Sequence, residues 1–456
     1  MTALLYLLGV VIFVAAILVS IGLHELGHMI PAKKFGGKVT QYFIGFGPTV
    51  WSKQVGETEY GVKAVPLGGY VKIVGMLPPA AEELVDSVEH DADGNPVHRV
   101  RKSNTGMFTQ LISDARSAEW ELIRPEDDDR LFYKMAWWKK VVVMAGGPTV
   151  NLLIAFVLFL IVFSTYGQRT QEVEPGAPVV ATVSQCAIAQ TGDGPPRQCT
   201  ADDPISPALD AGLVPGDRIV GFNGVEVTGW QQLRDLIEAN AQGTASITYV
   251  RDGEETTAET NTTVKPPSPG DDPEETVREV GFLGISPTTY VAVEKGGPIY
   301  TLDAMGTMTV DTVKALGQLP MKVFDVGQAI LGLEERAPDS PVSIVGGGRF
   351  AGEQTSSEVL DVQEKTIFLL TLIAGFNLFI GLFNFLPLLP LDGGHIASAL
   401  WEAVRRGIAR LRRKPDPGYV DAAKLLPVAY VVASAMLVMG VVLIVGDIVV
   451  PLDISG

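Results

Sequence analysis

The stretch "SIGLHELGHMIP" (residues 20–31) ends a long apolar run, "ALLYLLGVVIFVAAILVSIGL" (residues 3–23), that contains no charged residue. The run is long enough to cross the hydrocarbon core of a bilayer, which takes about 20 residues of helix. Two histidines and a glutamate therefore lie at or near membrane depth, where ionisable groups are costly and usually functional. This stretch predicts a helix that enters a membrane and carries chemistry at its far end.

On a helix, His24 and His28 lie on one face, one turn apart. Two imidazoles at this spacing can bind one Zn²⁺ at about 2.0–2.1 Å each. Glu25 lies beside that face, where the general base for a metal-activated water belongs. The alternative is a pair of core histidines next to a glutamate that only caps or pairs. The position at membrane depth favours the metal site.

The composition predicts a membrane protein with substantial polar parts. Of 456 residues, 47% are hydrophobic and 19% are charged. Four segments are long and apolar enough to span a bilayer: residues 3–23, 141–166, 366–391 and 425–450. The first has no basic region before it and no A-x-A site after it, so we expect a retained span, not a cleaved signal peptide. The net charge of −17 argues against a nucleic-acid partner, and the lipid bilayer is the expected environment.

Basic residues near the span ends predict the orientation. They follow the first span (Lys33, Lys34, Lys38), precede the second (Lys134, Lys139, Lys140) and crowd the link between the third and fourth, "RRGIARLRRK". The tail after the fourth span has none. Both termini are therefore expected outside the cytoplasm, together with the long region 167–365. The two cysteines, Cys186 and Cys199, lie in that region, which favours a disulfide over two free thiols.

The regions between the spans differ in character. Residues 41–76 alternate aromatic and β-branched residues with glycines, which predicts a β-hairpin loop that re-enters the membrane. Residues 167–290 are expected to form a β-rich extracytoplasmic domain, and "AGLVPGDRIVGFNG" (residues 211–224) resembles a PDZ domain. The complete expected order is a first membrane helix (1–40), the re-entrant loop (41–76), a cytoplasmic acidic insertion (77–138), a second helix (139–166), the PDZ domain (167–290), an extracytoplasmic amphipathic region (291–365), a third helix (366–395), a cytoplasmic basic loop (396–424), and a fourth helix with its tail (425–456).

A catalytic zinc usually has three protein ligands. The best third candidate is Asp392 in "NFLPLLPLDGGH" (residues 384–395), a single charge at the end of an apolar run broken by two prolines. Unpaired at the bilayer centre it would cost about 2.5–3.5 kcal/mol, which a bound cation offsets. The alternatives are that Asp392 is only a helix terminus at the interface, or that His395, expected to face the cytoplasm, is a fourth ligand. The first and third spans run in the same direction, so His24 and Asp392 are expected at the same depth.

These motifs together resemble the site-2 protease family of intramembrane zinc metalloproteases. The resemblance includes "IGFGP" (residues 44–48), "PLGGYVK" (66–72), "AGGPTVN" (145–151) and the PDZ-like run, and is nearest to the bacterial regulator-of-sigma-E type. It implies a polytopic α-helical protein of the bacterial plasma membrane. It also implies His24, His28 and Asp392 as zinc ligands, with Glu25 as the base. One PDZ domain is visible where some relatives have two, and the acidic insertion has no counterpart.

The resemblance further implies that Asn384 steadies the substrate backbone or an oxyanion, and that the re-entrant loop binds the unwound substrate as an added strand. The implied substrate is a single-span membrane protein, such as an anti-sigma factor, already cut outside the membrane by a site-1-type protease. The sequence therefore predicts an intramembrane zinc endopeptidase. The rival hypothesis is a non-catalytic protein, either a zinc transporter or a PDZ scaffold with a structural metal.

Overall fold

The computed structural model describes residues 2–78, 88–90, 96–98, 112, 123–187, 199–200, 203–241, 243–264 and 281–452. The chain divides into two compact units, each described by itself: a helical unit (Met1–Tyr166 with Gly296–Gly456) and a β-rich unit (Gly167–Lys295). Most of the predicted acidic insertion (77–138) lies outside the described residues. Within it the structure describes the short strands β3 (Val88–His90) and β4 (Pro96–His98) and the 3-10 helices η1 (Pro125–Arg130) and η2 (Phe132–Lys134).

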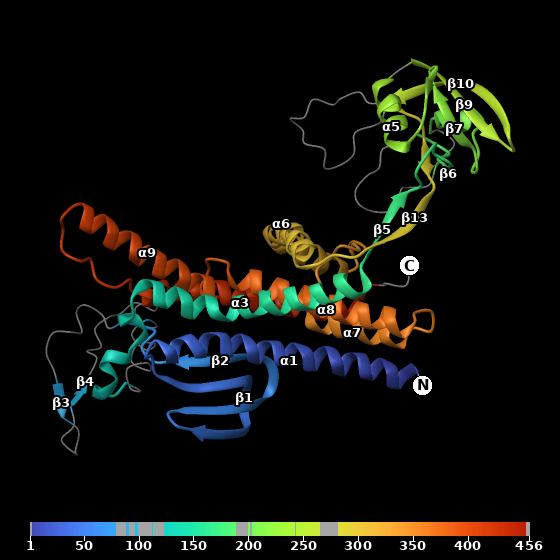
Figure 1. Ribbon diagram of the computed structural model, residues 1–456. Helices are drawn as coiled ribbons and strands as arrows, with labels where there is room; N and C mark the ends of the chain where they lie inside the picture. Colours follow the sequence, from blue (N-terminus) through green and yellow to red (C-terminus); the bar gives the residue numbers. More distant parts are fainter. Residues whose placement is uncertain are drawn as a thin grey trace. The chain divides into compact units, whose positions relative to one another are not determined.

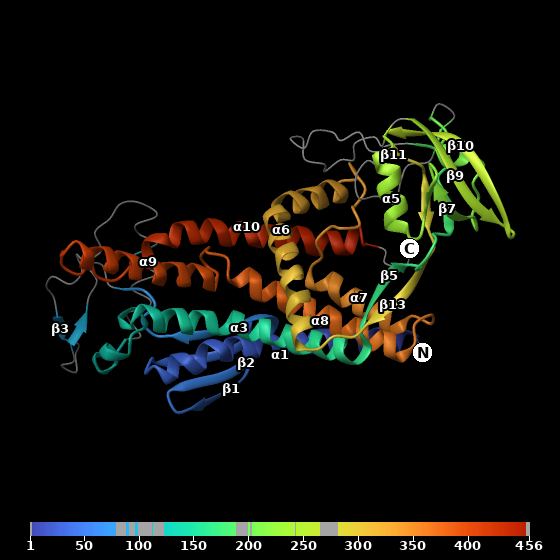
Figure 2. The same cartoon turned by 45° about the horizontal axis from the view of Figure 1, so that its top comes forward.

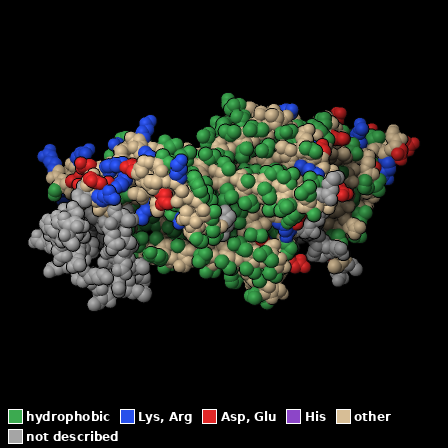
Figure 3. Space-filling model, turned by 90° about the horizontal axis from the view of Figure 1, so that it is seen from below, with side chains coloured by type: hydrophobic (Ala, Val, Ile, Leu, Met, Phe, Trp, Pro, Cys, Tyr) green, Lys and Arg blue, Asp and Glu red, His purple; other side chains and the backbone are tan. Residues whose placement is uncertain are grey.

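Four helices of the described chain are long and apolar enough to cross a membrane. They are α1 (Thr2–Lys34), α3 (Trp137–Ile161) with the π-helical turn η3 (Val162–Tyr166), α8 (Val362–Asn384), and α10 (Leu426–Val449) preceded by η4 (Ala422–Leu425). Their outward side chains are largely apolar, and hydrophobic side chains cover much of the face seen in Figure 3. A helix suits a bilayer because its backbone hydrogen bonds are internal.

The helices α1, α3 and α8 pack together as the scaffold of the helical unit (Figure 1). Small residues permit the close crossing of α1 and α3, since a methyl group at Gly27 would lie 2.5 Å from the carbonyl oxygen of Gly146. The segment predicted as an extracytoplasmic amphipathic region (291–365) contains α6 (Pro298–Ile330) and α7 (Ile344–Ser356). Helix α7 packs on α1, and α6 lies against α10 (Figure 2).

The third span ends earlier than the sequence predicts. Helix α8 ends at Asn384, and Asp392 begins a separate helix, α9 (Asp392–Leu411). The cause is the pair Pro387 and Pro390, which have no backbone N–H to continue the helical hydrogen bonds and disfavour helical geometry in the residues before them. Asp392 is therefore the first residue of a new helix, not the end of a span that continues from 366 to 391.

The predicted re-entrant loop contains an antiparallel pair, β1 (Val39–Val55) and β2 (Thr58–Ile73). Strand β2 bends so that its two ends flank β1: Gln41 of β1 lies opposite Lys72 on one side and opposite Glu59 on the other. Within the described chain, residues 69–73 of β2 pair only with residues 39–44 of β1, so this segment keeps one free edge. Tyr42 of β1 donates a 2.7 Å hydrogen bond to the carbonyl oxygen of Gly22, which attaches the sheet to α1.

The β-rich unit contains a five-stranded sheet in the order β11–β10–β9–β7–β8, with two short helices. The predicted β-rich character of this region is confirmed, and residues 207–251 form, in order, a short helix, a strand, a tight turn at Asn223–Gly224, a short strand, a helix and a strand. A buried cluster that includes Ile219, Phe222, Leu233 and Ile247 forms the core. Cys186 and Cys199 form the predicted disulfide. The bounds of the elements are β5 (Gln168–Val173), β6 (Val180–Val183), α4 (Pro207–Asp210), β7 (Arg218–Phe222), β8 (Val225–Glu226), α5 (Trp230–Ala239), β9 (Gly243–Arg251), β10 (Glu254–Val264), β11 (Gly281–Phe282), β12 (Ile285–Pro287) and β13 (Thr289–Glu294).

Candidate metal centre and active site

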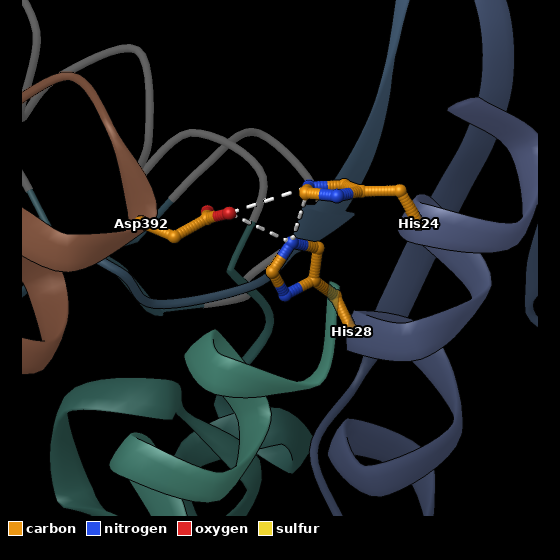
Figure 4. A group of neighbouring side chains, drawn as sticks. All are labelled: His24, His28 and Asp392. Carbon is orange, nitrogen blue, oxygen red and sulfur yellow. Dashed lines mark hydrogen bonds and ion pairs between the residues drawn. The ribbon is translucent and has the colours of Figure 1, made fainter. Parts of the chain in front are cut away.

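The structure brings the three predicted metal ligands together (Figure 4). His24 and His28 extend from successive turns of α1, and Asp392 extends from the first turn of α9. The two Nε2 atoms are 3.2 Å apart. The Asp392 Oδ2 atom lies 3.3 Å from His24 Nε2 and 3.2 Å from His28 Nε2. Three potential ligand atoms thus form a nearly equilateral triangle in a buried place.

Hydrogen bonds to α3 orient both imidazoles. His24 Nδ1 lies 2.5 Å from the side-chain oxygen of Asn151, and His28 Nδ1 lies 2.8 Å from the carbonyl oxygen of Val143. Since both partners are acceptors, each Nδ1 carries the proton and each Nε2 presents a lone pair to the centre of the triangle. This is the arrangement of metal-binding histidines, whose second nitrogen is held by an oxygen acceptor.

The three side chains fit a zinc ion. Ligand atoms bound at about 2.0–2.1 Å in a tetrahedron are about 3.3–3.4 Å apart, close to the distances observed here. Asp392 Oδ2 is buried and receives no hydrogen bond from the described part of the chain, as expected for an oxygen with a metal partner. Gly147 of α3 leaves the necessary space, because a methyl group there would lie only 2.7 Å from His24 Nε2.

A cavity of about 460 Å³ opens onto the triangle. Glu25 lines it, and the backbone N–H of Val71 on β2 faces the Glu25 carboxylate. Asn384, at the end of α8, lines the same cavity and donates from Nδ2 to the carbonyl oxygen of Ile380 at 3.1 Å. His395 also lines the cavity, whereas the sequence predicts that it faces the cytoplasm. The reason is that α9 begins at Asp392, so residue 395 lies one helical turn further on, on the same face.

A buried network of side-chain hydrogen bonds, which was not predicted from the sequence, supports His24. Asn151 donates from Nδ2 to Ser20 Oγ and to Asn377 Oδ1, both at 3.1 Å, and Ser20 also donates to Asn377. These hydrogen bonds join α1, α3 and α8 behind the His24 imidazole. A signal was present in the sequence, since these are polar residues within apolar spans, where such groups usually pair between helices.

Comparisons with known proteins identify the family of this chain. The model of Peptidase family M50 matches residues 12–421. The chain belongs to peptidase family M50. It is 33% identical over 445 residues to the zinc metalloprotease Rip1 of Mycobacterium tuberculosis, with 96% of each chain covered. It is 31% identical over 457 residues to the protein of the same name from Mycolicibacterium smegmatis, with 98% of each chain covered.

Membership of family M50 confirms the predicted site-2 protease resemblance. The protein is a zinc metalloprotease and a multi-pass membrane protein, and its cofactor is Zn²⁺. As a member of this family it is a membrane-embedded protease that acts on membrane-protein substrates. The rival hypotheses of a zinc transporter and of a non-catalytic PDZ scaffold are therefore wrong.

Proposed function

We propose that His24, His28 and Asp392 bind the catalytic zinc, that Glu25 is the general base, and that Asn384 contacts the substrate. The observation that carries this proposal is the triangle of Nε2 and Oδ2 atoms beside a cavity that Glu25 and Asn384 also line. When bound there, the zinc would lower the pKa of a water molecule and polarise the scissile carbonyl.

Glu25 and Asn384 perform the remaining steps of peptide hydrolysis. The Glu25 carboxylate takes a proton as the water oxygen bonds to the carbonyl carbon. It then gives that proton to the leaving nitrogen as the C–N bond breaks, so no net proton is consumed at Glu25. Asn384 is within the same cavity and can donate from Nδ2 to a substrate carbonyl or oxyanion after releasing its bond to Ile380.

The free edge of β2 supports strand addition by the substrate. Residues 69–73 pair on one side with β1, and Gly69, Tyr70 and Val71 line the cavity. A substrate helix has its carbonyls hydrogen-bonded internally, so it must unwind before attack. Pairing with this edge would replace the hydrogen bonds that the unwound backbone has lost.

The proposed biological role is regulated intramembrane proteolysis of a single-span protein, such as an anti-sigma factor, after a first cut by a site-1-type protease outside the membrane. We place the protein in the bacterial plasma membrane with both termini extracytoplasmic. The distribution of Lys and Arg around the spans supports this orientation. The β-rich unit, proposed as a PDZ domain at 167–290, would then contact the extracytoplasmic end of the trimmed substrate.

The direct experiment is Glu25→Gln in the full chain, with a single-span test substrate reconstituted in liposomes. The expected result is loss of cleavage by at least about a hundredfold, since general-base catalysis contributes that much or more, with zinc still bound. Glu358→Gln, at an exposed glutamate, is the matched control and should cleave normally. Full activity of the Glu25 variant would refute the assignment of the base.

A further inference from the structure

A buried ion pair joins α3 to α9 away from the metal ligands. Lys140 Nζ lies 2.7 Å from Glu402 Oε2, and these residues are only 6% and 2% exposed. Arg406 Nη2 lies 3.2 Å from the other carboxylate oxygen of Glu402. The Tyr419 ring lies 5.1 Å from both the Lys140 nitrogen and the Arg406 guanidinium carbon. Buried charges of this kind are stable only when they remain paired.

Lys140 lies on the face of α3 that organises the metal site. Val143, Gly147 and Asn151 follow it by three, seven and eleven residues, a spacing that keeps all four residues on one side of a helix. Val143 and Asn151 hold the two imidazoles, and Gly147 leaves the space between them. The ion pair is therefore built on the same rigid surface that orients both histidines.

Glu402 lies on the helix that carries the third ligand. Asp392 is the first residue of α9, and Glu402 is ten residues further, about 15 Å along the axis. Residues 385–391 form a proline-containing turn, so the direction of α8 does not continue into α9. The direction of α9, and with it the place of Asp392, must be set by what α9 packs against, which includes α3.

We propose that the Lys140–Glu402–Arg406 cluster is a positioning device for the metal site: it holds α9 against α3 so that Asp392 meets His24 and His28. This inference rests on the proposed zinc ligands. It makes Lys140 and Glu402 positioning residues, which act on the metal through Asp392. The cluster would then determine how tightly zinc is held, and not only how stable the fold is.

The test is zinc affinity of the full chain, measured by competition with a chelator, together with the rate of zinc release. Glu402→Gln removes the anion and leaves two cations facing each other. We therefore expect a zinc affinity about tenfold lower than wild type, which is the smallest loss usually seen when a residue that supports the metal ligands is replaced. Lys140→Met should cost less, because Arg406 still neutralises Glu402. The double variant should bind zinc more tightly than Glu402→Gln alone.

A matched control separates positioning from general destabilisation. Arg336→Met breaks another buried ion pair of the helical unit, in which Arg336 Nη2 lies 2.8 Å from Asp447 Oδ1 and neither side chain is more than 4% exposed. It should lower the unfolding temperature and leave zinc affinity unchanged. An affinity of Glu402→Gln within twofold of wild type, or an equal loss in Arg336→Met, would overturn the proposal. His28→Ala tests the ligand set separately, since retention of zinc in that variant would contradict the metal site itself.

Discussion

Adding one methyl group at Gly147 should remove zinc from a folded protein. The Cβ of Gly147→Ala would lie 2.7 Å from His24 Nε2, whereas ordinary contacts of a carbon atom are about 3.5 Å. The imidazole would have to retreat by about 0.8 Å, and metal–ligand distances tolerate about 0.2 Å. The other nitrogen of the ring cannot follow freely, because Asn151 holds it at 2.5 Å.

The expected loss of zinc affinity is at least about a hundredfold. This is the upper end of the loss caused by replacing a hydrogen-bond partner of a metal ligand, because the methyl group displaces an atom of the proposed ligand His24 itself. Zinc content after dialysis against a chelator, and the unfolding temperature of the same sample, provide the assay. Alanine is the better helix former by roughly 0.5–1 kcal/mol, so helix propensity does not oppose folding of the variant.

Gly375→Ala on α8 is the matched control, because among the described residues no atom outside the neighbouring backbone of α8 lies within 4 Å of the methyl group it would add. It should keep zinc and activity. Stoichiometric zinc with normal affinity in Gly147→Ala would refute the reasoning, since the space between the imidazoles would then not be needed by the metal. Loss of zinc in both variants would also count against it, because the effect would not depend on that space.

Asn151→Ala removes the acceptor that orients the His24 imidazole, and with it the centre of the buried hydrogen-bond network. Zinc affinity should therefore fall about 10–100-fold in a chelator competition. An unchanged affinity would contradict the role of Asn151. Burial alone would raise the pKa of the Asp217 carboxyl, but its hydrogen bonds from Arg251 outweigh burial and hold that pKa below its ordinary value. The pair therefore stabilises the β-rich unit above about pH 4, and this stabilisation is lost as the pH falls through the folded-state pKa. Hydrogen exchange of that unit between pH 6 and 3 should show this loss in the wild type and a flatter profile in Asp217→Asn; identical profiles would refute it. Cys199→Ser opens a disulfide that joins residues 13 apart and should lower the unfolding free energy of the unit by about 3 kcal/mol in urea titrations, while an unchanged midpoint would show that the link does not stabilise it.

The convergence of His24, His28 and Asp392 could be predicted from the sequence because two simple rules combine. Helical spacing puts the histidines on one face, and the Lys and Arg residues at the span ends give the first and third spans the same direction. Two motifs far apart in the chain must then reach the same depth. The nearly equilateral triangle of His24 Nε2, His28 Nε2 and Asp392 Oδ2 agrees with that reasoning.

What could not be predicted depends on how helices face one another. Asn151 lies in a motif that the sequence analysis noted, yet its bond to His24 depends on the crossing of α1 and α3 at Gly27 and Gly146, which spacing does not specify. The prolines predicted a break in the third span. They did not reveal that a new helix starts at Asp392 and turns His395 toward the cavity.

The most direct measurement is zinc K-edge X-ray absorption on the purified full chain, with Asp392→Ala compared under the same conditions. If α1 and α9 hold one shared ion through His24, His28 and Asp392, the wild type shows two imidazole nitrogens and carboxylate or water oxygen at about 2.0–2.2 Å. The variant then loses its zinc or changes its coordination shell. A variant that keeps stoichiometric zinc with an identical spectrum would contradict the account.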